Sequence, residues 1–322
     1  MSKIVIISLI FLNIFQLFSQ KEESVFADDF KRLDFILEND VFNRTDRYYT
    51  NGIILSYSSP AFAEIFLFGL FSPPKHDQFD RYGIGIAHKI YTPIDKNNLI
   101  DLENDRPFSS YFLFNLHKET RKSISKSSNY FQIGIGLLGV DAKGEEIQNL
   151  IHKFLSGNNP VVGWENQIKN EFLFDIQYIY EKGFFHSKYF DFLALAKVQA
   201  GTLKDNLGLG VKLLFGWKPN YYTQNIKKSN KLGEGIYIFS EIKWNSHWIA
   251  YDATLAGGVL HKEENIFVIS SNQIENFVHK AAISLNFRYK NYQVSFMQTI
   301  LSSEFDGGLP HQYGGILLLT EF

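Results

Sequence analysis

Segments of about ten residues with alternating apolar and polar side chains recur along this chain, and they restrict its fold more than any other feature. In "FLFDIQYIYEK", the apolar or aromatic residues from Phe172 to Tyr180 alternate with polar residues such as Asp175 and Gln177. Successive side chains of a β-strand point to opposite faces, so this segment predicts a strand with one apolar face. "LGLGVKLLFGW" and "YQVSFMQTI" repeat the pattern. It predicts an all-β fold, but it occurs in soluble sandwiches as well as in membrane barrels.

Composition excludes several classes of protein. The chain has 322 residues, enough for one large β domain or two smaller ones. Its formal net charge of −2 provides no basic field for nucleic acid. The sequence has no cysteine, which excludes disulfides and thiolate metal sites. The 17 tyrosines and 31 phenylalanines favour strands and interfacial aromatic belts.

The first twenty residues, "MSKIVIISLIFLNIFQLFSQ", have the pattern of a secretory signal peptide. Lys3 provides the short positive region, an apolar run follows from Ile4 to Phe18, and the small residue Ser19 comes before the charged "KEES". A single membrane anchor is the alternative, although the run is shorter than the roughly 20 apolar residues of a spanning helix. We expect residues 1–20 to be cleaved and residues 21–322 to form one exported domain.

Three features favour a transmembrane barrel over a soluble β domain. The small and polar faces of the strands carry glycines as well as charges, as the lumen of a barrel does, and the apolar faces end in aromatic residues. A signal peptide without a later spanning helix leaves secretion or the bacterial outer membrane as destinations. The chain also finishes on "GGILLLTEF", and a final strand that ends in Phe resembles the assembly signal of outer-membrane barrels.

The alternating segments predict an antiparallel barrel of about twelve strands, an even number as in bacterial single-chain barrels. They lie near residues 33–38, 50–58, 82–91, 108–117, 129–138, 171–181, 189–200, 207–217, 235–256, 279–290, 291–301 and 312–322. Division of the ninth at Asn245 would give thirteen, so we keep it as one long strand. With both termini in the periplasm, the connections after odd-numbered strands face outward.

The outward connections contain most of the chemically reactive residues. The first, "ENDVFNRTDRYYTNG", has the carboxylates Asp40 and Asp46, three amides that include Asn39 and Asn51, the cations Arg44 and Arg47, and two threonine hydroxyls. A solvated surface loop is the simpler interpretation of such a segment. Its arginines, together with Arg106, would then be salt-bridged surface charges, whereas in a lipid-binding site they would pair with phosphates.

A short helix is predicted in the third outward connection, over "GEEIQNLIHKFL". Glu145 and Glu146 favour its first turn, and Gly157 can end it. Gln148 and His152 are four residues apart, so they project from one face of the helix. A single helical histidine is usually structural or solvated. At the top of a membrane barrel, it is also a candidate general base.

Several motifs in order resemble the outer-membrane lipid A deacylase family: "ENDVFNRTDRYYTNG", "IYTP", "DRPF", "GVDAKGEEIQNLIH" and "WENQI". The resemblance spans residues 39–167. It implies a twelve-stranded barrel in the outer membrane and calcium-dependent hydrolysis of the 3′-acyloxyacyl ester of lipid A. It also implies an active site between the barrel wall and an extracellular helix.

The family's site residues correspond to positions in this sequence. His152 matches the catalytic base and Gln148 its neighbour on the helix, whereas Asn39 and Asp40 match the amide and carboxylate near Ca²⁺. Thr50 matches the hydroxyl that opens the second strand, and Lys96 is the lysine nearest to the family's cation. The family has an acidic residue shortly after the histidine, where this chain has "SGNN". We expect either a lower activity or transfer of the acidic role to Glu145, Glu146 or Asp141.

The residue types also suit ester hydrolysis without the family. A histidine can deprotonate water, and a Ca²⁺ ion or a lysine can stabilise the oxyanion. Ca²⁺ prefers the oxygen ligands that Asp40, Asn39 and Thr50 provide. The sequence has no "GxSxG", so direct attack by water is favoured over an acyl-enzyme. The expected partners are lipopolysaccharide and outer-membrane lipids, without nucleic acid, and the protein is expected to be a monomer. The alternatives are an outer-membrane phospholipase and a non-enzymatic porin or structural barrel.

Overall fold

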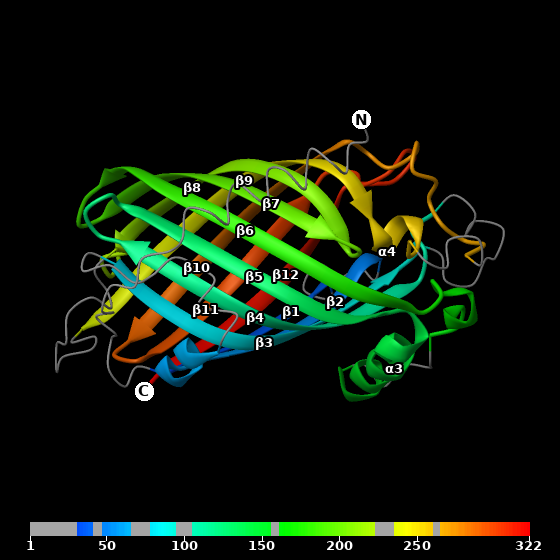
Figure 1. Ribbon diagram of the computed structural model, residues 1–322, viewed down its shortest axis with the longest axis horizontal. Helices are drawn as coiled ribbons and strands as arrows, with labels where there is room; N and C mark the ends of the chain where they lie inside the picture. The colour runs from blue at the N-terminus through cyan, green and yellow to red at the C-terminus, as the bar shows by residue number, and fades with distance from the viewer. Residues whose placement is uncertain are drawn as a thin grey trace.

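The computed structural model describes residues 31–40, 47–65, 78–94, 105–155, 161–222, 235–259 and 265–322. These residues form a closed barrel in which each strand pairs antiparallel with the next and β1 pairs with β12 (Figure 1). The predicted signal peptide, residues 1–20, lies outside the described residues. No helix among the described residues is long and apolar enough to cross a membrane.

The barrel has twelve strands, which confirms the predicted number. They are β1 (Arg32–Asn39), β2 (Tyr48–Ser58), β3 (Gln78–Thr92), β4 (Ser109–Lys122), β5 (Ser127–Leu138), β6 (Glu171–His186), β7 (Phe190–Gly201), β8 (Lys204–Trp217), β9 (Ile236–Asp252), β10 (Phe277–Tyr289), β11 (Tyr292–Leu301) and β12 (His311–Glu321). The ninth strand is undivided, as predicted. Several strands extend beyond the predicted bounds, because their polar ends continue the ladder where the apolar alternation stops.

The alternation of side chains separates a lipid-facing outer wall from a polar lumen. On β8, Leu207 and Leu209 are 50% and 70% exposed on the outer wall, whereas the lumenal Asn206 is buried. Asp175 on β6 also lies in the lumen and is fully buried. Large apolar side chains exposed around a closed barrel are stable only in an apolar solvent, so the outer wall fits a membrane.

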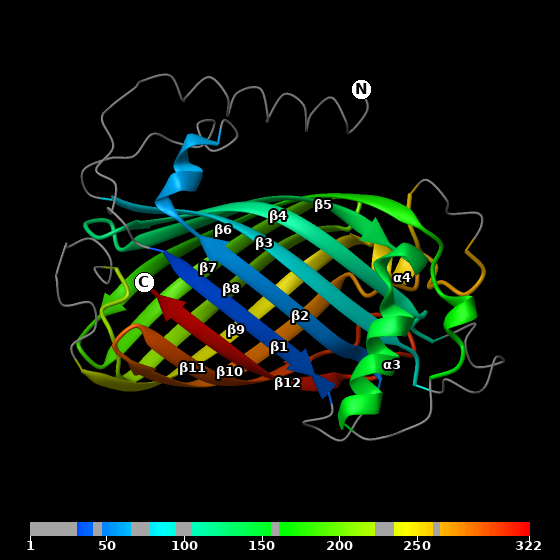
Figure 2. The same ribbon diagram turned by 90° about the horizontal axis from the view of Figure 1, so that it is seen from below.

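Ion pairs cross the lumen at the end of the barrel where β1 begins and β12 ends, which we call the inner end (Figure 2). Arg81 pairs with Glu119 at 2.7 Å, and it also reaches Glu321 at 3.7 Å, on a strand that is not its neighbour. Arg121 pairs with Glu119 at 2.6 Å and donates to the carbonyl of Tyr221 at 3.0 Å, in the chain that follows β8. This network fills the inner end of the lumen, as expected for a narrow barrel and unlike an open porin.

The opposite end, the outer end, is covered by the connections between strands. The short helix α4 (Ala253–Ala256) packs there with Tyr48 and Phe305 in a buried apolar cluster. Arg106 is fully buried, pairs with Glu304 at 2.6 Å, and lies over the ring of Tyr91. For Arg106, the structure therefore favours the salt-bridged interpretation over a phosphate contact. Helix α3 (Gly144–Leu155) lies at the same end (Figures 1 and 2).

Protease cleavage can test the orientation of the barrel in the membrane, because its two ends are expected to give opposite results. A protease site inserted after Gly307, between β11 and β12, should be cut from outside intact cells. The same insertion after Lys290, in the turn between β10 and β11, should resist the protease. The barrel of each variant should keep its heat-dependent mobility in detergent gels. The reverse cleavage pattern would mean that α3 faces the periplasm.

Candidate active site

Helix α3 spans Gly144–Leu155, the residues that the sequence predicts. Two carboxylates in its first turn, Glu145 and Glu146, interact favourably with the helix dipole. A hydrogen bond with its own backbone N–H lowers the pKa of Glu146, and an ion pair with Lys143 at 3.2 Å adds to this effect. Both glutamates are exposed, so they stabilise the start of the helix and face solvent.

The segment that begins α3 is fixed to the outer wall of the barrel. On β3, Lys89 and Tyr91 line the lumen, so the alternating residues His88 and Ile90 face outward. The Nε2 atom of His88 lies 2.7 Å from the carbonyl oxygen of Ala142, to which it donates. Ile90 forms a buried cluster with Phe108 and Trp164, on which Ile147 of α3 packs. The helix therefore covers lipid-facing wall rather than the lumen.

Close contact between the helix and the wall requires glycine at the first position of α3. A Cβ atom at Gly144 would lie 2.4 Å from Oγ of Ser110 and 2.7 Å from the ring of Trp164. Any larger residue would push the helix away from β4. The sequence of this segment thus sets both the start of the helix and its distance from the barrel.

The two predicted helical site residues lie one turn apart on α3. Gln148 is 1% exposed, and its Oε1 atom accepts a hydrogen bond of 2.8 Å from the indole Nε1 of Trp164. Its Nε2 atom is buried and has no hydrogen-bond partner among the described residues. His152 is half-buried in the last part of the described helix. The glutamine is therefore held in place with one donor unused.

Asn39 and Asp40 lie at the outer end of β1, and both are buried. Glu38 forms a hydrogen bond with Tyr49 of the lumen, so the following residue, Asn39, faces the outer wall. Asp40 is 2% exposed, and its Oδ2 atom accepts a hydrogen bond of 2.8 Å from the backbone N–H of Arg47. The structure thus provides a buried carboxylate beside an outward amide.

A β-bulge in β2 changes which residues reach the outer wall. Tyr49 pairs with Tyr91 and Asn51 pairs with Ile90, so Thr50 is an extra residue in β2. The Thr50 hydroxyl lies 2.8 Å from that of Thr92, which follows Ile90 on the outward side of β3. The bulge therefore turns Thr50 toward the same side as Asn51, whereas a regular strand would send neighbours to opposite sides.

Asn51 is an amide of the first outward connection to which the sequence assigned no role in the site. It pairs in register with Asn39 on β1 and is 1% exposed. Its Oδ1 and Nδ2 atoms are both buried without a hydrogen-bond partner among the described residues. Buried amides nearly always find partners, so a fully unpaired one needs an explanation. A polar ligand that occupies the outer wall would provide it.

The structure describes most of the predicted site positions, but not all of them. Asn39, Asp40 and Thr50 come together at the outer ends of β1 and β2, and α3 brings Gln148 and His152 to that end of the barrel (Figure 2). Lys96 and Arg44 lie outside the described residues.

None of the three proposed acidic substitutes lies in the site. Asp141 is exposed and accepts a hydrogen bond of 2.8 Å from Asn170, and the two glutamates of α3 face solvent. His88 is a further missed residue: its Nδ1 atom is buried without a partner among the described residues.

The donors at the ends of β1 and β2 suit a hard cation. Within the described part of the chain, no group of three or more histidines and carboxylates has the arrangement of a metal site. One buried carboxylate, two amides and a hydroxyl are nevertheless the oxygen donors that Ca²⁺ accepts, and the unpaired Oδ1 of Asn51 is among them. These donors suit a hard cation better than a metal that prefers nitrogen or sulfur.

A comparison with family models identifies the relationship. The model of the outer membrane protein LpxR matches residues 4–322. The chain belongs to the LpxR family. This family is one of the bacterial outer membrane, which agrees with the lipid-facing outer wall. A search of curated proteins finds no significant match.

The solved structure of LpxR has the same fold as this chain. LpxR from Salmonella typhimurium is 20% identical, with a TM-score of 0.72, and the match covers 90% of this chain and 99% of that one. The translocator domain of the autotransporter NalP from Neisseria meningitidis is 6% identical, with a TM-score of 0.42 and coverage of 98% and 95%. The β domain of the Bordetella autotransporter BrkA is 8% identical, with a TM-score of 0.40 and coverage of 90% and 97%. The LpxR fold thus extends over almost the whole barrel.

Proposed function

We propose that this LpxR-family protein is a lipid A 3′-O-deacylase, which hydrolyses the 3′-acyloxyacyl ester in the outer leaflet. The observation that carries the proposal is the position of the unpaired amides. On the lipid-facing side of the wall, Asn51 and Gln148 have buried polar atoms that find no hydrogen-bond partner within the described part of the chain. A soluble substrate would approach from water or from the lumen. A lipid whose ester group lies near the membrane surface would reach this place directly from the bilayer.

His152 acts as the general base in the proposed mechanism. It takes a proton from water, which attacks the ester carbonyl, and then returns the proton to the leaving alkoxide. The carbonyl oxygen becomes an oxyanion as the tetrahedral intermediate forms. Side-chain amides placed before the reaction stabilise this charge without reorganisation. The unused donors of Gln148 and Asn51 suit this role.

Calcium is part of the proposal, with Asp40, Asn39 and Thr50 as its protein ligands. When bound, it would supply positive charge next to the ester carbonyl. The hydrogen bond from the Arg47 backbone holds the Asp40 carboxylate in place. The hydroxyl of Thr92 likewise holds the hydroxyl of Thr50 in place, because the two oxygens are 2.8 Å apart.

Mass spectrometry of lipid A tests the function most directly. Lipid A from cells that express the protein should lose the mass of the 3′-acyloxyacyl group, and cells with an empty vector should not show this loss. Purified enzyme should then be offered lipid A and glycerophospholipid in parallel. Release of fatty acid from the glycerophospholipid alone would identify the enzyme as a phospholipase instead.

Replacement of Asn51 shows whether its side-chain amide has a functional or a structural role. We expect Asn51→Leu to reduce deacylation by about 10²-fold, the usual cost of a lost oxyanion donor. The free energy of unfolding should stay the same or increase, because the buried polar atoms that are removed form no hydrogen bond with any residue that the structure describes. Lipid A mass spectra and urea denaturation in detergent measure the two effects.

Asn286→Leu is the matched control for Asn51→Leu. Asn286 is a buried lumenal amide that donates to the carbonyl of Phe239 at 3.2 Å and to Ser284 at 3.0 Å. Its replacement should destabilise the barrel and leave the activity of the folded fraction unchanged. If Asn51→Leu destabilises the barrel as much and keeps full activity, Asn51 is a structural residue.

A further inference from the structure

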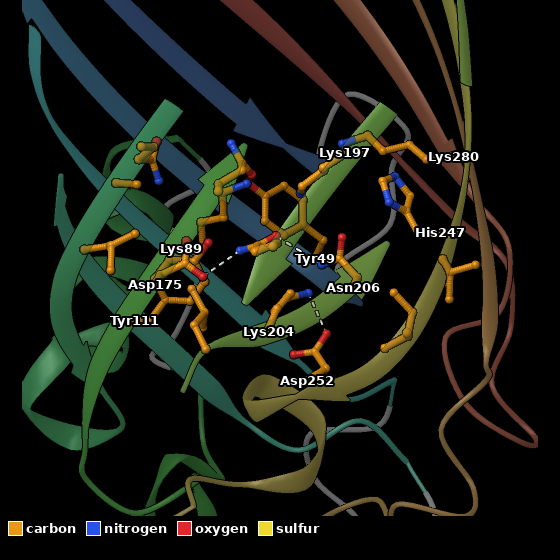
Figure 3. A pocket seen from close by; sticks show the side chains of 18 of the residues that line it. Tyr49, Lys89, Tyr111, Asp175, Lys197, Lys204, Asn206, His247, Asp252 and Lys280 are labelled. Carbon is orange, nitrogen blue, oxygen red and sulfur yellow. Dashed lines mark hydrogen bonds and ion pairs between the residues drawn. The ribbon is translucent and has the colours of Figure 1, made fainter. Parts of the chain in front are cut away.

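The lumen contains a cavity that is separate from the proposed active site. It has a volume of about 420 Å³, and Figure 3 shows side chains that line it. Lys89 and Tyr91 line this cavity, whereas their neighbours His88 and Ile90 face α3 on the other side of the wall. The barrel wall therefore separates two polar sites.

Three basic side chains gather on one wall of the cavity: Lys197 of β7, His247 of β9 and Lys280 of β10 (Figure 3). Lys197 pairs with Gly208, and Gly208 pairs with His247. A Cβ atom at Gly208 would lie 2.5 Å from Nδ1 of His247 and 3.4 Å from Cβ of Lys197. The missing side chain on β8 therefore leaves room for the lysine and the histidine to face one ligand.

Two of the four lysines that line the cavity have a carboxylate partner, whereas Lys197 and Lys280 differ. Lys204 pairs with Asp252 at 2.5 Å, and Lys89 pairs with Glu38 at 3.6 Å. Lys280 donates to the hydroxyl of Tyr313 at 2.9 Å, which carries no charge. Lys197 is attracted by the carboxylate of Asp175. The positive charge at this wall is therefore incompletely balanced.

Electrostatic repulsion makes this arrangement unfavourable when the cavity contains only water. The ammonium group of Lys197 is repelled by those of Lys204, Lys280 and Lys89, and Asp175 is the carboxylate that attracts it. Asp175 is already bound through Oδ1 to Gln199 at 2.8 Å. Confined like charges cost free energy unless a counter-charge lies between them. An anion at this wall would supply that counter-charge.

We propose that the lumenal cavity binds a phosphate group between Lys197, Lys280 and His247. The oxygens of phosphate accept several charge-assisted hydrogen bonds at once, which matches a cluster of donors. Two buried acceptor atoms of the cavity, Oδ2 of Asp175 and Oδ1 of Asn206, have no partner among the described residues. They suit hydroxyl donors, so a phosphorylated sugar fits the cavity better than inorganic phosphate.

Calorimetry on the folded, full-length barrel in detergent tests the proposal with three probes. Inorganic phosphate and glucose 1-phosphate should both bind, the sugar phosphate more tightly, whereas glucose should produce no signal. If neither phosphate compound binds at millimolar concentration, the cavity is not a phosphate site. Equal binding of glucose and glucose 1-phosphate would also overturn the proposal, because recognition would then not depend on charge.

A matched pair of variants locates the binding. Lys197→Met should weaken glucose 1-phosphate binding about tenfold or more, the loss of one charge-assisted hydrogen bond. Lys188→Met makes the same change of charge at an exposed residue between β6 and β7 and should bind as the parent does. The heat-dependent gel mobility of both barrels confirms folding. Parental affinity in a folded Lys197→Met barrel would overturn the proposal.

Tungstate, a phosphate mimic with a strong anomalous signal, provides a test that needs no variant. A crystal of the parental protein soaked in tungstate should show a peak beside Lys197 and Lys280. Peaks on the surface without one in the lumen would overturn the proposal. Since neither measurement uses lipid A hydrolysis, the result is independent of the proposed enzymatic function.

Discussion

His152→Ala is expected to reduce release of the 3′-acyloxyacyl group by about 10²–10⁴-fold, the usual cost of a lost general base. The barrel itself should remain folded, because α3 lies outside the wall and its imidazole is not part of the strand ladder. Lipid A mass spectra of cells that express the variant measure the activity. The heat-dependent mobility of the protein in detergent gels reports folding.

Lys153→Ala is the control for this result. Lys153 follows His152 on the same helix and is exposed, so its loss should leave deacylation near the parental rate. Gln148→Ala should reduce activity less than His152→Ala, although it also leaves the indole N–H of Trp164 without its acceptor. Parental activity in a folded His152→Ala variant would refute the assignment of the base. The next candidate for the base would then be His88, which contacts the segment that begins α3.

Removal of calcium is expected to abolish deacylation as completely as His152→Ala does. A chelator should stop deacylation, and added Ca²⁺ should restore it. Asp40→Ala should reproduce the effect of the chelator and should also lose binding of ⁴⁵Ca²⁺ by the purified barrel. The second measurement matters because it reports the metal site without the reaction. Asp40 is the expected ligand because its carboxylate is 2% exposed and fixed by the Arg47 backbone.

Asp141→Ala provides the control for the metal. Asp141 lies just before α3, is exposed, and bonds to Asn170 rather than to the site. Its loss should change neither calcium binding nor activity. Full activity in the presence of the chelator would remove calcium from the mechanism. Recovery with Zn²⁺ but not with Ca²⁺ would mean that the site selects a different ion.

Most of the barrel could be predicted from the sequence, because the alternation of side chains along a strand is local. The same is true of α3, where the acidic first turn and the apolar spacing lie within Gly144–Leu155. The candidate active site was only partly predictable. The family motifs indicate Asn39, Asp40, Thr50, Gln148 and His152, but nothing in "YYTNG" shows that Thr50 forms a bulge. The importance of Asn51 follows from that bulge.

Residues that meet across the barrel escape prediction for a different reason. Arg106 belongs to a loop rich in charges, and only the closed barrel brings Glu304, far along the chain, within 2.6 Å of it. Lys197 and His247 are likewise brought together by the register of β7, β8 and β9. Local patterns carry no information on such pairs, because their proximity depends on how distant strands align.

The wall that separates the two polar sites is a single strand layer thick. Along β3, His88, Ile90 and Thr92 face outward, whereas Lys89 and Tyr91 face the lumen. Adjacent residues of β3 therefore belong to surfaces on opposite sides of the wall. A point substitution can alter the chemistry of the lipid side and leave the lumen unchanged, or the reverse. Natural selection can consequently act on the two compartments separately, through interleaved positions of the same five-residue stretch.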